Sequence, residues 1–379
     1  MGCFWSNHEG NTVQIRYAYR TIKRSLIVNE YALENPCELD GFAFLEFSGP
    51  NQDQLDKQFQ SMGFQLAAAH KNQNIKLYQQ GEIQFIVNGA SDCQAQEHAA
   101  IHGAGACAMG FRVKNVQKAY DHALKNGATP FQDCKHADHG LLAIQAIGGS
   151  VIYFVDESQQ PFANQWQQSV ENAGQHECGL TFIDHLTHNV YRGNMDKWAK
   201  FYESIFNFRE IRFFNIVGKM TGLISRALAS PCNKIKIPLN ESKDDKSQIE
   251  EFLHEYKGEG IQHIALGTDN IYETVESLRH GGVTFLDVPD TYYEMIEKRI
   301  PWHEEPLENL SKGRILIDGE TDRNAGLLLQ IFTENVFGPV FFEIIQRRGN
   351  QGFGEGNFQA LFEAIERDQI KRGTLQESQ

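Results

Sequence analysis

The sequence lacks several features that would assign it at once to a class of protein. No apolar run approaches the roughly 20 residues that a membrane-spanning helix requires, so we expect no membrane span. Lysine and arginine total 35 against 49 acidic residues. The resulting net charge of −14 argues against nucleic-acid binding, which depends on clustered positive charge. There is no low-complexity tract, and the 41% hydrophobic and 22% charged residues are typical of a globular protein.

Cysteine is also scarce, with seven residues among 379. The cysteines are odd in number and scattered along the chain, and no two have the C-x-x-C spacing. This pattern argues against a disulfide framework and predicts reduced thiols in a cytoplasmic protein. The length is sufficient for two domains, each with its own core.

Residues 1–33 form a basic extension without a clear structural period, and we expect it to be poorly ordered. It has no apolar run of about seven residues followed by small residues, so it does not resemble a secretory signal. Its first residues, "MGCFWS", match the acylation pattern M-G-x-x-x-S. Because that short pattern often occurs by chance, we favour a poorly ordered extension, or an upstream start codon ahead of the folded part.

An internal repeat organises the rest of the chain. Residues 110–131 align with residues 265–286, and both stretches read as a strand, an asparagine, an amphipathic helix, a glycine and a second strand. Asn115 and Asn270 stand at the expected helix starts, where an asparagine side chain can accept from a free backbone N–H.

A second pairing aligns residues 40–64 with residues 183–208, again as a strand that leads into a helix. The sequence therefore predicts four modules of strand, helix and strands, two in each half. The polar stretch 159–179, rich in glutamine and asparagine, is typical of a linker. We expect an N-terminal domain at 34–158 and a C-terminal domain at 180–373.

Three positions are apolar in the N-terminal half and able to bind a metal in the C-terminal half. The alignment pairs Phe42 with His185, Ala108 with His263, and Phe154 with Glu343. A single buried histidine is usually explained by packing, but three such replacements predict a site present in one half only. Two imidazoles and one carboxylate from three strands form the facial triad of non-haem Fe(II) oxygenases, which leaves coordination positions open.

The strand period helps to choose the ligands. His185 and His188 are three residues apart in "IDHLTHNV" and must face opposite sides of a strand, so only one can reach the site. The alignment selects His185, and we interpret His188 as a packing residue. Glu343 shares a strand face with Phe341 and Ile345, where an unpaired carboxylate would be costly and a metal would remove that cost.

Over about residues 36–373 the sequence resembles the 4-hydroxyphenylpyruvate dioxygenase family. The matching stretches are "IDHLTHNVYRG", "KIPLNES", "GEGIQHIAL", "LLLQIFT", "FFEIIQRRG" and "GFGEGNFQALFEAIE". The resemblance implies an α+β fold of two domains, each made of paired βαβββ modules that form an open barrel (the vicinal-oxygen-chelate arrangement). It also implies one Fe(II) per protomer, bound in the C-terminal barrel, which makes the domain at 180–373 the catalytic one and the domain at 34–158 a structural domain without metal. Residues 1–33 lie outside the resemblance.

The resemblance implies roles for residues at matching positions. The Fe(II) ligands would be His185, His263 and Glu343. The substrate pocket would be lined by Ser225, Asn240, Gln248, Gln262, Gln330, Phe332, Phe341, Phe353, Asn357 and Phe358. Among these, the reaction itself would involve Gln330, Gln262, Asn240 and Phe358. Gln330 shares a strand face with Phe332, whereas Gln262 neighbours a ligand and would point away from the site in a regular strand. For each phenylalanine, ordinary core packing is the alternative.

The implied reaction converts 4-hydroxyphenylpyruvate, a 2-oxo acid, and O2 to homogentisate and CO2 in tyrosine and phenylalanine catabolism. The enzyme would be a cytoplasmic homo-oligomer, a dimer or tetramer. The amphipathic final segment, 357–373, would form a lid helix over the barrel mouth. Because homogentisate autoxidises to a brown polymer, the family is also linked with pigment and with proteins described as haemolysins.

Two alternatives remain open. A 4-hydroxymandelate synthase would use the same ligands and substrate but oxidise the benzylic carbon; Pro238 and Phe358 favour the ring-hydroxylating enzyme instead. A binding protein of the same fold without catalysis would lack the complete triad, and the intact His185, His263 and Glu343 argue against that alternative.

Overall fold

The computed structural model describes residues 34–132, 140–162, 164–168, 177–217, 222–320, 322–357 and 360. The expected extension, residues 1–33, lies outside the described residues. So does the expected lid helix, apart from residues 357 and 360. Within the described ranges, no helix combines the length and the apolar character needed to cross a bilayer.

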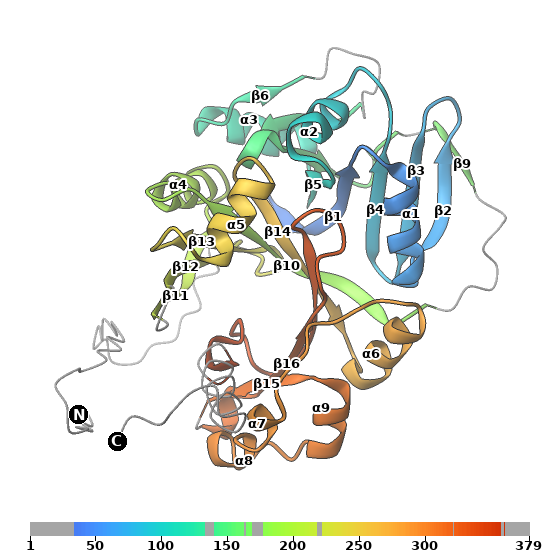
Figure 1. Cartoon of the computed structure of the whole chain (residues 1–379). Coiled ribbons are helices and arrows are strands. Elements are labelled where there is room, and N and C mark those ends of the chain that lie inside the picture. Colours follow the sequence, from blue (N-terminus) through green and yellow to red (C-terminus); the bar gives the residue numbers. More distant parts are fainter. Residues whose placement is uncertain are drawn as a thin grey trace. The chain divides into compact units, whose positions relative to one another are not determined.

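The N-terminal half forms one sheet with the strand order β6-β7-β8-β5-β1-β4-β3-β2-β9 (Figure 1). Its strands are β1 (Leu39–Ser48), β2 (Gln65–His70), β3 (Ile75–Gln80), β4 (Ile83–Asn88), β5 (Gly105–Val113), β6 (Pro130–Phe131), β7 (Ala143–Gln145), β8 (Val151–Val155) and β9 (Trp166–Gln168). Its helices are α1 (Gln52–Ser61), α2 (Gln94–His102), α3 (Val116–Lys125) and the 3-10 turn η1 (Ile147–Gly149). Strand β9 falls inside the stretch expected to be a linker and pairs with β2, so part of that stretch extends the sheet.

The C-terminal half forms a second sheet with the order β11-β12-β13-β10-β14-β17-β16-β15 (Figure 1). Its strands are β10 (Leu180–Val190), β11 (Arg209–Val217), β12 (Gly222–Ala229), β13 (Lys236–Ser242), β14 (Gly260–Thr268), β15 (Leu316–Gly319), β16 (Leu327–Phe332) and β17 (Phe341–Arg348). Its helices are α4 (Met195–Phe206), α5 (Gln248–Glu255), α6 (Ile271–His280), α7 (Asp290–Tyr293), α8 (Ile296–Arg299), α9 (Leu307–Gly313) and the 3-10 turn η2 (Arg323–Ala325).

The two sheets correspond strand for strand once β9 is set aside, because β2-β3-β4-β1-β5-β8-β7-β6 matches the order of the second sheet. Each sheet is two βαβββ modules placed side by side. In the second sheet these modules are β10-α4-β11-β12-β13 and β14-α6-β15-β16-β17. The four modules predicted from the repeat are confirmed. Helices α2 and α5 connect the modules within each half, and α7 to α9 are inserted between α6 and β15.

The predicted helix starts are also confirmed. The Asn115 side chain accepts from the backbone N–H of Lys118 at 2.8 Å and begins α3. The Asn270 side chain accepts from the N–H of Glu273 at 3.5 Å and begins α6. Each asparagine satisfies one of the backbone donors left free in the first turn of a helix.

A continuous buried cluster spans both halves. Aromatic side chains join them, with the ring of Phe47 5.7 Å from that of Phe337 and the ring of Phe85 6.2 Å from that of Phe342. The opposite face of the first sheet is buried as well, in a cluster that includes Phe44. A sheet buried on both faces accounts for the nearly continuous apolar character of β1 and β5.

Candidate metal centre and substrate pocket

Three side chains from three neighbouring strands converge on the inner face of the second sheet. They are His185 on β10, His263 on β14 and Glu343 on β17, and each offers a ligand atom within 4.8 Å of the others. The Glu343 Oε2 atom lies 3.2 Å from His185 Nε2 and 3.7 Å from His263 Nε2. His185 and Glu343 are buried, and His263 is slightly exposed. These are the three residues that the repeat comparison selected.

A β-bulge precedes each ligand histidine. On β10, Ile183 pairs with Leu266 and His185 with Ala265, so Asp184 is an extra residue opposite the partner strand. On β14, Thr187 of β10 pairs with His263 and His188 pairs with Ile261, so Gln262 is the extra residue. A bulge breaks the strict alternation of side chains. It therefore brings Asp184 and Gln262 to the same side as the histidines that follow them.

The two bulge residues hold the far nitrogens of the two ligand rings. The Nδ1–H of His185 donates to Asp184 Oδ1 at 2.8 Å, and the Nδ1–H of His263 donates to Gln262 Oε1 at 3.3 Å. Because both oxygens only accept, both rings carry their proton on Nδ1 and present Nε2 toward Glu343. An acceptor that fixes the tautomer in this way is the usual support of a metal-binding histidine.

Asp184 is itself held by a buried arginine. Arg347 on β17 donates from Nε and Nη2 to the two carboxylate oxygens, at 2.7 and 2.8 Å. Burial alone would raise the pKa of Asp184, but hydrogen bonds from Arg347 and His185 outweigh it and hold the pKa well below its ordinary value. Asp184 therefore stays ionised beside His185. Neither Asp184 nor Arg347 was selected from the sequence.

The two ligand histidines differ in their electrostatic surroundings. Burial works against a charge on His185, but Glu343 and Asp184 outweigh it and raise the pKa of this imidazole. Burial, together with the charge of His185, lowers the pKa of His263 well below its ordinary value. The carboxylates of Glu343 and Asp184 thus make the surroundings of His185 negative, which suits a bound cation.

The three groups fit a divalent transition metal. Ligand atoms about 2.1 Å from a six-coordinate ion lie about 3 Å apart at right angles. Glu343 Oε2 lies 3.2 and 3.7 Å from the two Nε2 atoms, near that value, and the three ligand atoms as a set are more widely spread, within 4.8 Å. The other carboxylate oxygen, Glu343 Oε1, is buried and has no hydrogen-bond partner among the described residues. Two imidazoles and one carboxylate on one side of an ion leave further coordination positions open.

His188 lies on the other face of β10, as the strand period predicted. Its Nε2 is 2.8 Å from the hydroxyl of Tyr202 on α4. Burial lowers the pKa of His188 to about 3, so the ring is neutral at physiological pH. The structure thus separates the two histidines of "IDHLTHNV" into one that faces the triad and one that packs against a helix.

The strand registers show that two of the three predicted correspondences between the halves are wrong, those of Phe42 with His185 and of Phe154 with Glu343. In the second sheet, His185 and Glu343 lie on the two strands beside β14, and each is in register with Ala265. When Ala108 is matched with His263, the residue of the N-terminal half that corresponds to Ala265 is Gly110. Gly110 pairs with Phe44 and with Tyr153. The counterparts of the triad are therefore Phe44, Ala108 and Tyr153, and the expected Phe42 and Phe154 lie on the other face, in the shared cluster. The pairing with Phe42 was wrong because the stretch from His185 to the start of α4 at Met195 is two residues longer than the stretch from Phe44 to the start of α1 at Gln52, which shifted an alignment based on the helices.

Several predicted pocket residues surround the triad. Phe341 stacks on His263, with ring centroids 4.9 Å apart at 20°, and Phe332 meets the same ring edge-on at 6.4 Å. Phe353 contacts His185 edge-on at 5.2 Å. Gln330 is buried on β16, and its Oε1 has no hydrogen-bond partner among the described residues. These four side chains form a wall beside the triad.

A row of polar side chains crosses the inner face beside this wall. Ser225 on β12 pairs with Asn240 on β13, and Asn240 pairs with Asn189 on β10. Paired residues on neighbouring strands share a face and lie about 5 Å apart. Asn189 was not selected from the sequence. It is fully buried, and neither atom of its side-chain amide has a partner among the described residues.

The remaining predicted pocket residues are placed differently. Gln248 is exposed at the first position of α5. Asn357 is buried, and its Oδ1 accepts from the hydroxyl of Tyr292 at 2.6 Å and from Arg299 at 3.3 Å. Asn357 is thus tied to α7 and α8. Phe358 lies outside the described residues.

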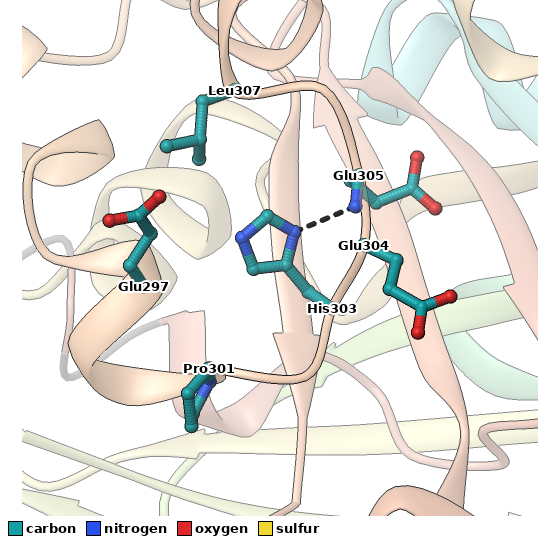
Figure 2. A pocket seen from close by; sticks show the side chains of 6 residues that line it. All are labelled: Glu297, Pro301, His303, Glu304, Glu305 and Leu307. Atoms are coloured by element: carbon teal, nitrogen blue, oxygen red, sulfur yellow. Dashed lines mark hydrogen bonds between the residues drawn. The ribbon is translucent and has the colours of Figure 1, made fainter.

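A hollow on the loop around residue 303 is a separate feature (Figure 2). It is lined by Glu297, Pro301, His303, Glu304, Glu305 and Leu307, none of which belongs to the triad or the predicted pocket. The backbone N–H of Glu305 donates to His303 Nδ1 at 2.8 Å. The Glu305 carboxylate accepts from the hydroxyl of Tyr272 at 2.7 Å. These polar groups are engaged in holding the loop, and we assign no reaction to them.

Comparisons with known proteins agree with the two-sheet architecture. A family model described as hydroxyphenylpyruvate dioxygenase, HPPD, N-terminal matches residues 33–164. A model described as the glyoxalase/bleomycin resistance protein/dioxygenase superfamily matches residues 182–295. Together they cover most of both halves.

Curated relatives match nearly end to end. A 4-hydroxyphenylpyruvate dioxygenase of Legionella pneumophila is 72% identical over 345 residues, which cover 90% of this chain and 98% of the relative. A protein named hemolysin VllY of Vibrio vulnificus is 52% identical over 350 residues, with 90% and 98% covered. A solved mutant of 4-hydroxymandelate synthase from Streptomyces coelicolor superposes with a TM-score of 0.74 at 26% identity, covering 87% of this chain and 99% of that one. By family model, by relatives and by architecture, the chain belongs to the 4-hydroxyphenylpyruvate dioxygenase family.

Proposed function

We propose that this chain catalyses the reaction of 4-hydroxyphenylpyruvate with O2 to give homogentisate and CO2. The observation that carries the proposal is the convergence of His185, His263 and Glu343 on the inner face of the second sheet. Each imidazole is held at Nδ1 by a neighbouring oxygen and is aimed through Nε2 at the carboxylate. Membership of the family connects this geometry with the reaction.

The metal we propose is Fe(II), one per protomer. Its support is the donor set, because two histidines and one carboxylate on one side of an ion are typical of non-haem Fe(II) oxygenases. Fe(II) bound there would supply the redox chemistry that activates O2. The positions left open by three protein ligands suit a substrate that chelates through its 2-oxo and carboxylate oxygens.

The protein's own side chains would hold and shield the substrate. We assign the aromatic ring to the wall formed by Phe332, Phe341 and Phe353. Gln330, the fourth member of that wall, has an amide oxygen without a partner among the described residues and can orient the substrate. We assign the phenolic hydroxyl to the polar row Ser225, Asn240 and Asn189, because Asn189 offers both a donor and an acceptor that nothing else occupies among the described residues. The roles of Gln248, Asn357 and Phe358 remain those implied by the resemblance.

A 4-hydroxymandelate synthase is the second candidate, since a solved enzyme of that name superposes over 87% of this chain. Both activities begin from the same substrate and consume O2, so only the product separates them. With Fe(II)-loaded protein and 4-hydroxyphenylpyruvate, we expect O2 uptake and chromatographed homogentisate in equal amounts. 4-Hydroxymandelate as the main product would establish the second candidate. An Fe(II)-loaded protein without O2 uptake would overturn both.

The cytoplasmic location and the homo-oligomeric state implied by the resemblance belong to the same proposal. Size-exclusion chromatography with light scattering measures the oligomeric state directly. A dimer or tetramer is the expected result, and a monomer at micromolar concentration would contradict it.

A further inference from the structure

Arg347 on β17 lies four residues after Glu343 and has three sets of contacts. Its Nε and Nη2 donate to the Asp184 carboxylate. Its Nη1 donates to two backbone carbonyl oxygens of the segment that follows β17, those of Asn350 at 3.1 Å and Gly352 at 2.7 Å. The guanidinium also lies over the Phe353 ring, 5.6 Å from its centroid. One side chain thus holds both the support of a metal ligand and the C-terminal segment.

Through these contacts Arg347 touches two groups that both contact the His185 ring. Asp184 holds the His185 ring at Nδ1, and Phe353 packs against the same ring at 5.2 Å. Both Asp184 and Phe353 are contacted by Arg347. A shift of the segment that carries Phe353 would therefore disturb His185 directly through ring packing and indirectly through Arg347.

The segment also reaches the predicted pocket. Gly354 has a φ of +77°, and a Cβ added there would overlap the amide of Gln330. The backbone N–H of Gly352 donates to the side chain of Asn350 at 2.7 Å, and that of Phe353 donates to Glu355 at 2.9 Å. Residues 350–357 therefore form a hydrogen-bonded segment packed against Gln330, Arg347 and His185.

We infer that Arg347 is a positioning residue that couples the order of residues 350–357 to metal binding at His185, through Asp184. The inference rests on the metal site of the proposed function and adds a role for side chains outside it. Coupling of this kind is reciprocal: if the ordered segment strengthens metal binding, the bound metal must order the segment. Hydrogen exchange of the segment's backbone N–H groups reports the order, and a metal titration reports the binding.

The test compares Arg347→Lys with the wild type. Lysine keeps a positive charge beside Asp184 but lacks the planar fork that bonds a carboxylate and two carbonyls at once. Arg226→Lys is the matched control, because Arg226 on β12 bonds Glu203 of α4 at 2.9 Å and lies on the face opposite the triad. Co(II) serves as the probe under anaerobic conditions, because its visible absorption reports the ligand set as well as the affinity.

For the wild type and for Arg226→Lys, we expect Co(II) to bind and to slow exchange in residues 350–357. For Arg347→Lys, we expect Co(II) affinity to fall by about 10-fold to 100-fold, the usual cost of losing the support of a ligand, and the slowing of exchange to disappear. Wild-type affinity in Arg347→Lys, or retained slowing, would overturn the inference while leaving the proposed metal site intact. A wild type that binds no Co(II) would overturn both.

A double variant decides the question if Arg347→Lys does not fold. Asp184→Asn combined with Arg347→Gln removes two opposite charges together, so the net charge of the buried cluster, which also contains Lys236 at 3.9 Å from Asp184, does not change. The new amide oxygen can still accept from His185 Nδ1, which should return Co(II) affinity toward the wild-type value. The segment has lost the Arg347 Nη1 group that donates to its two carbonyl oxygens, so the metal-dependent slowing of exchange should still be absent. Its presence in the double variant would contradict the coupling.

Discussion

The two halves of the molecule share a strand order and two β-bulges but differ at the side chains that the bulges present. In the C-terminal half the bulges present Asp184 with His185 and Gln262 with His263. In the N-terminal half the same irregularities occur on β1 and β5, where the register shifts at Ala43 before Phe44 and at Cys107 before Ala108. The β-bulges are therefore common to both halves, but only those of the C-terminal half present side chains that can bind a metal.

This difference shows what the fold provides and what the side chains add. A bulge brings two consecutive residues toward one face, which allows a ligand and its hydrogen-bond partner to be neighbours in sequence. In the N-terminal half that space is filled, with Phe44 and Tyr153 in ring contact at 6.0 Å. We therefore interpret the first sheet as structural support, joined to the second by contacts such as that of Phe47 with Phe337.

The largest expected effect comes from removing a ligand. His185→Ala, His263→Ala and Glu343→Ala should each reduce turnover to the background of protein without metal, because two remaining ligands hold the cation poorly. His188→Ala is the matched control on the same strand, since His188 faces Tyr202. It should lose stability but keep the metal. The measurement is metal content after gel filtration together with O2 uptake. Loss of metal in His188→Ala with retention in His185→Ala would reverse the assignment.

The next largest effect should come from a core substitution in the N-terminal half, and it should change stability without changing metal binding. Phe44 is fully buried, so Phe44→Ala should lower the free energy of unfolding by about 3 to 5 kcal/mol while metal content stays at the wild-type level. Phe213→Ala, at a phenylalanine that is 54% exposed on β11, should change stability by less than about 0.5 kcal/mol. Urea unfolding of both variants measures the difference. Metal loss in folded Phe44→Ala would show that the first half takes part in the site.

The smallest expected effect is a pH dependence where the halves meet. His98 on α2 lies 3.3 Å from the hydroxyl of Tyr256, and burial, with the nearby His102, lowers its pKa from 6.5 to about 3. Below pH 6.5 the unfolded chain binds a proton that the folded chain does not, so stability falls as the pH falls toward 3. At pH 5 the loss should be about 2 kcal/mol relative to pH 7.5.

His98→Gln is the comparison for that experiment, since glutamine can accept from the same hydroxyl but does not titrate. The urea-unfolding free energy of the wild type should fall by about 2 kcal/mol more than that of the variant between pH 7.5 and pH 5. Equal losses in the two proteins would mean that His98 binds a proton as readily in the folded state as in the unfolded chain, which contradicts the lowered pKa.

The modules, the helix starts and the three triad residues could be predicted from the sequence, because they follow from periodicity and from a comparison of the halves. The residues that surround and support the triad could not be predicted. Strict alternation places Asp184 and Gln262 on the face opposite their histidines, and the bulges that overturn this expectation leave no mark in the residue pattern. Arg347 was missed because its partner Asp184 is 163 residues away in sequence. Asn189 was missed because only the paired register places it beside Asn240.

The central claim is that one metal site exists and that it lies in the C-terminal half. Equilibrium dialysis of the wild type against Fe(II) under anaerobic conditions tests it most directly, with His263→Ala dialysed in parallel. We expect close to one iron per protomer in the wild type and close to none in the variant. A reproducible value near two in the wild type, or near one in the variant, would contradict it, because a second set of ligands would then have to exist outside His185, His263 and Glu343.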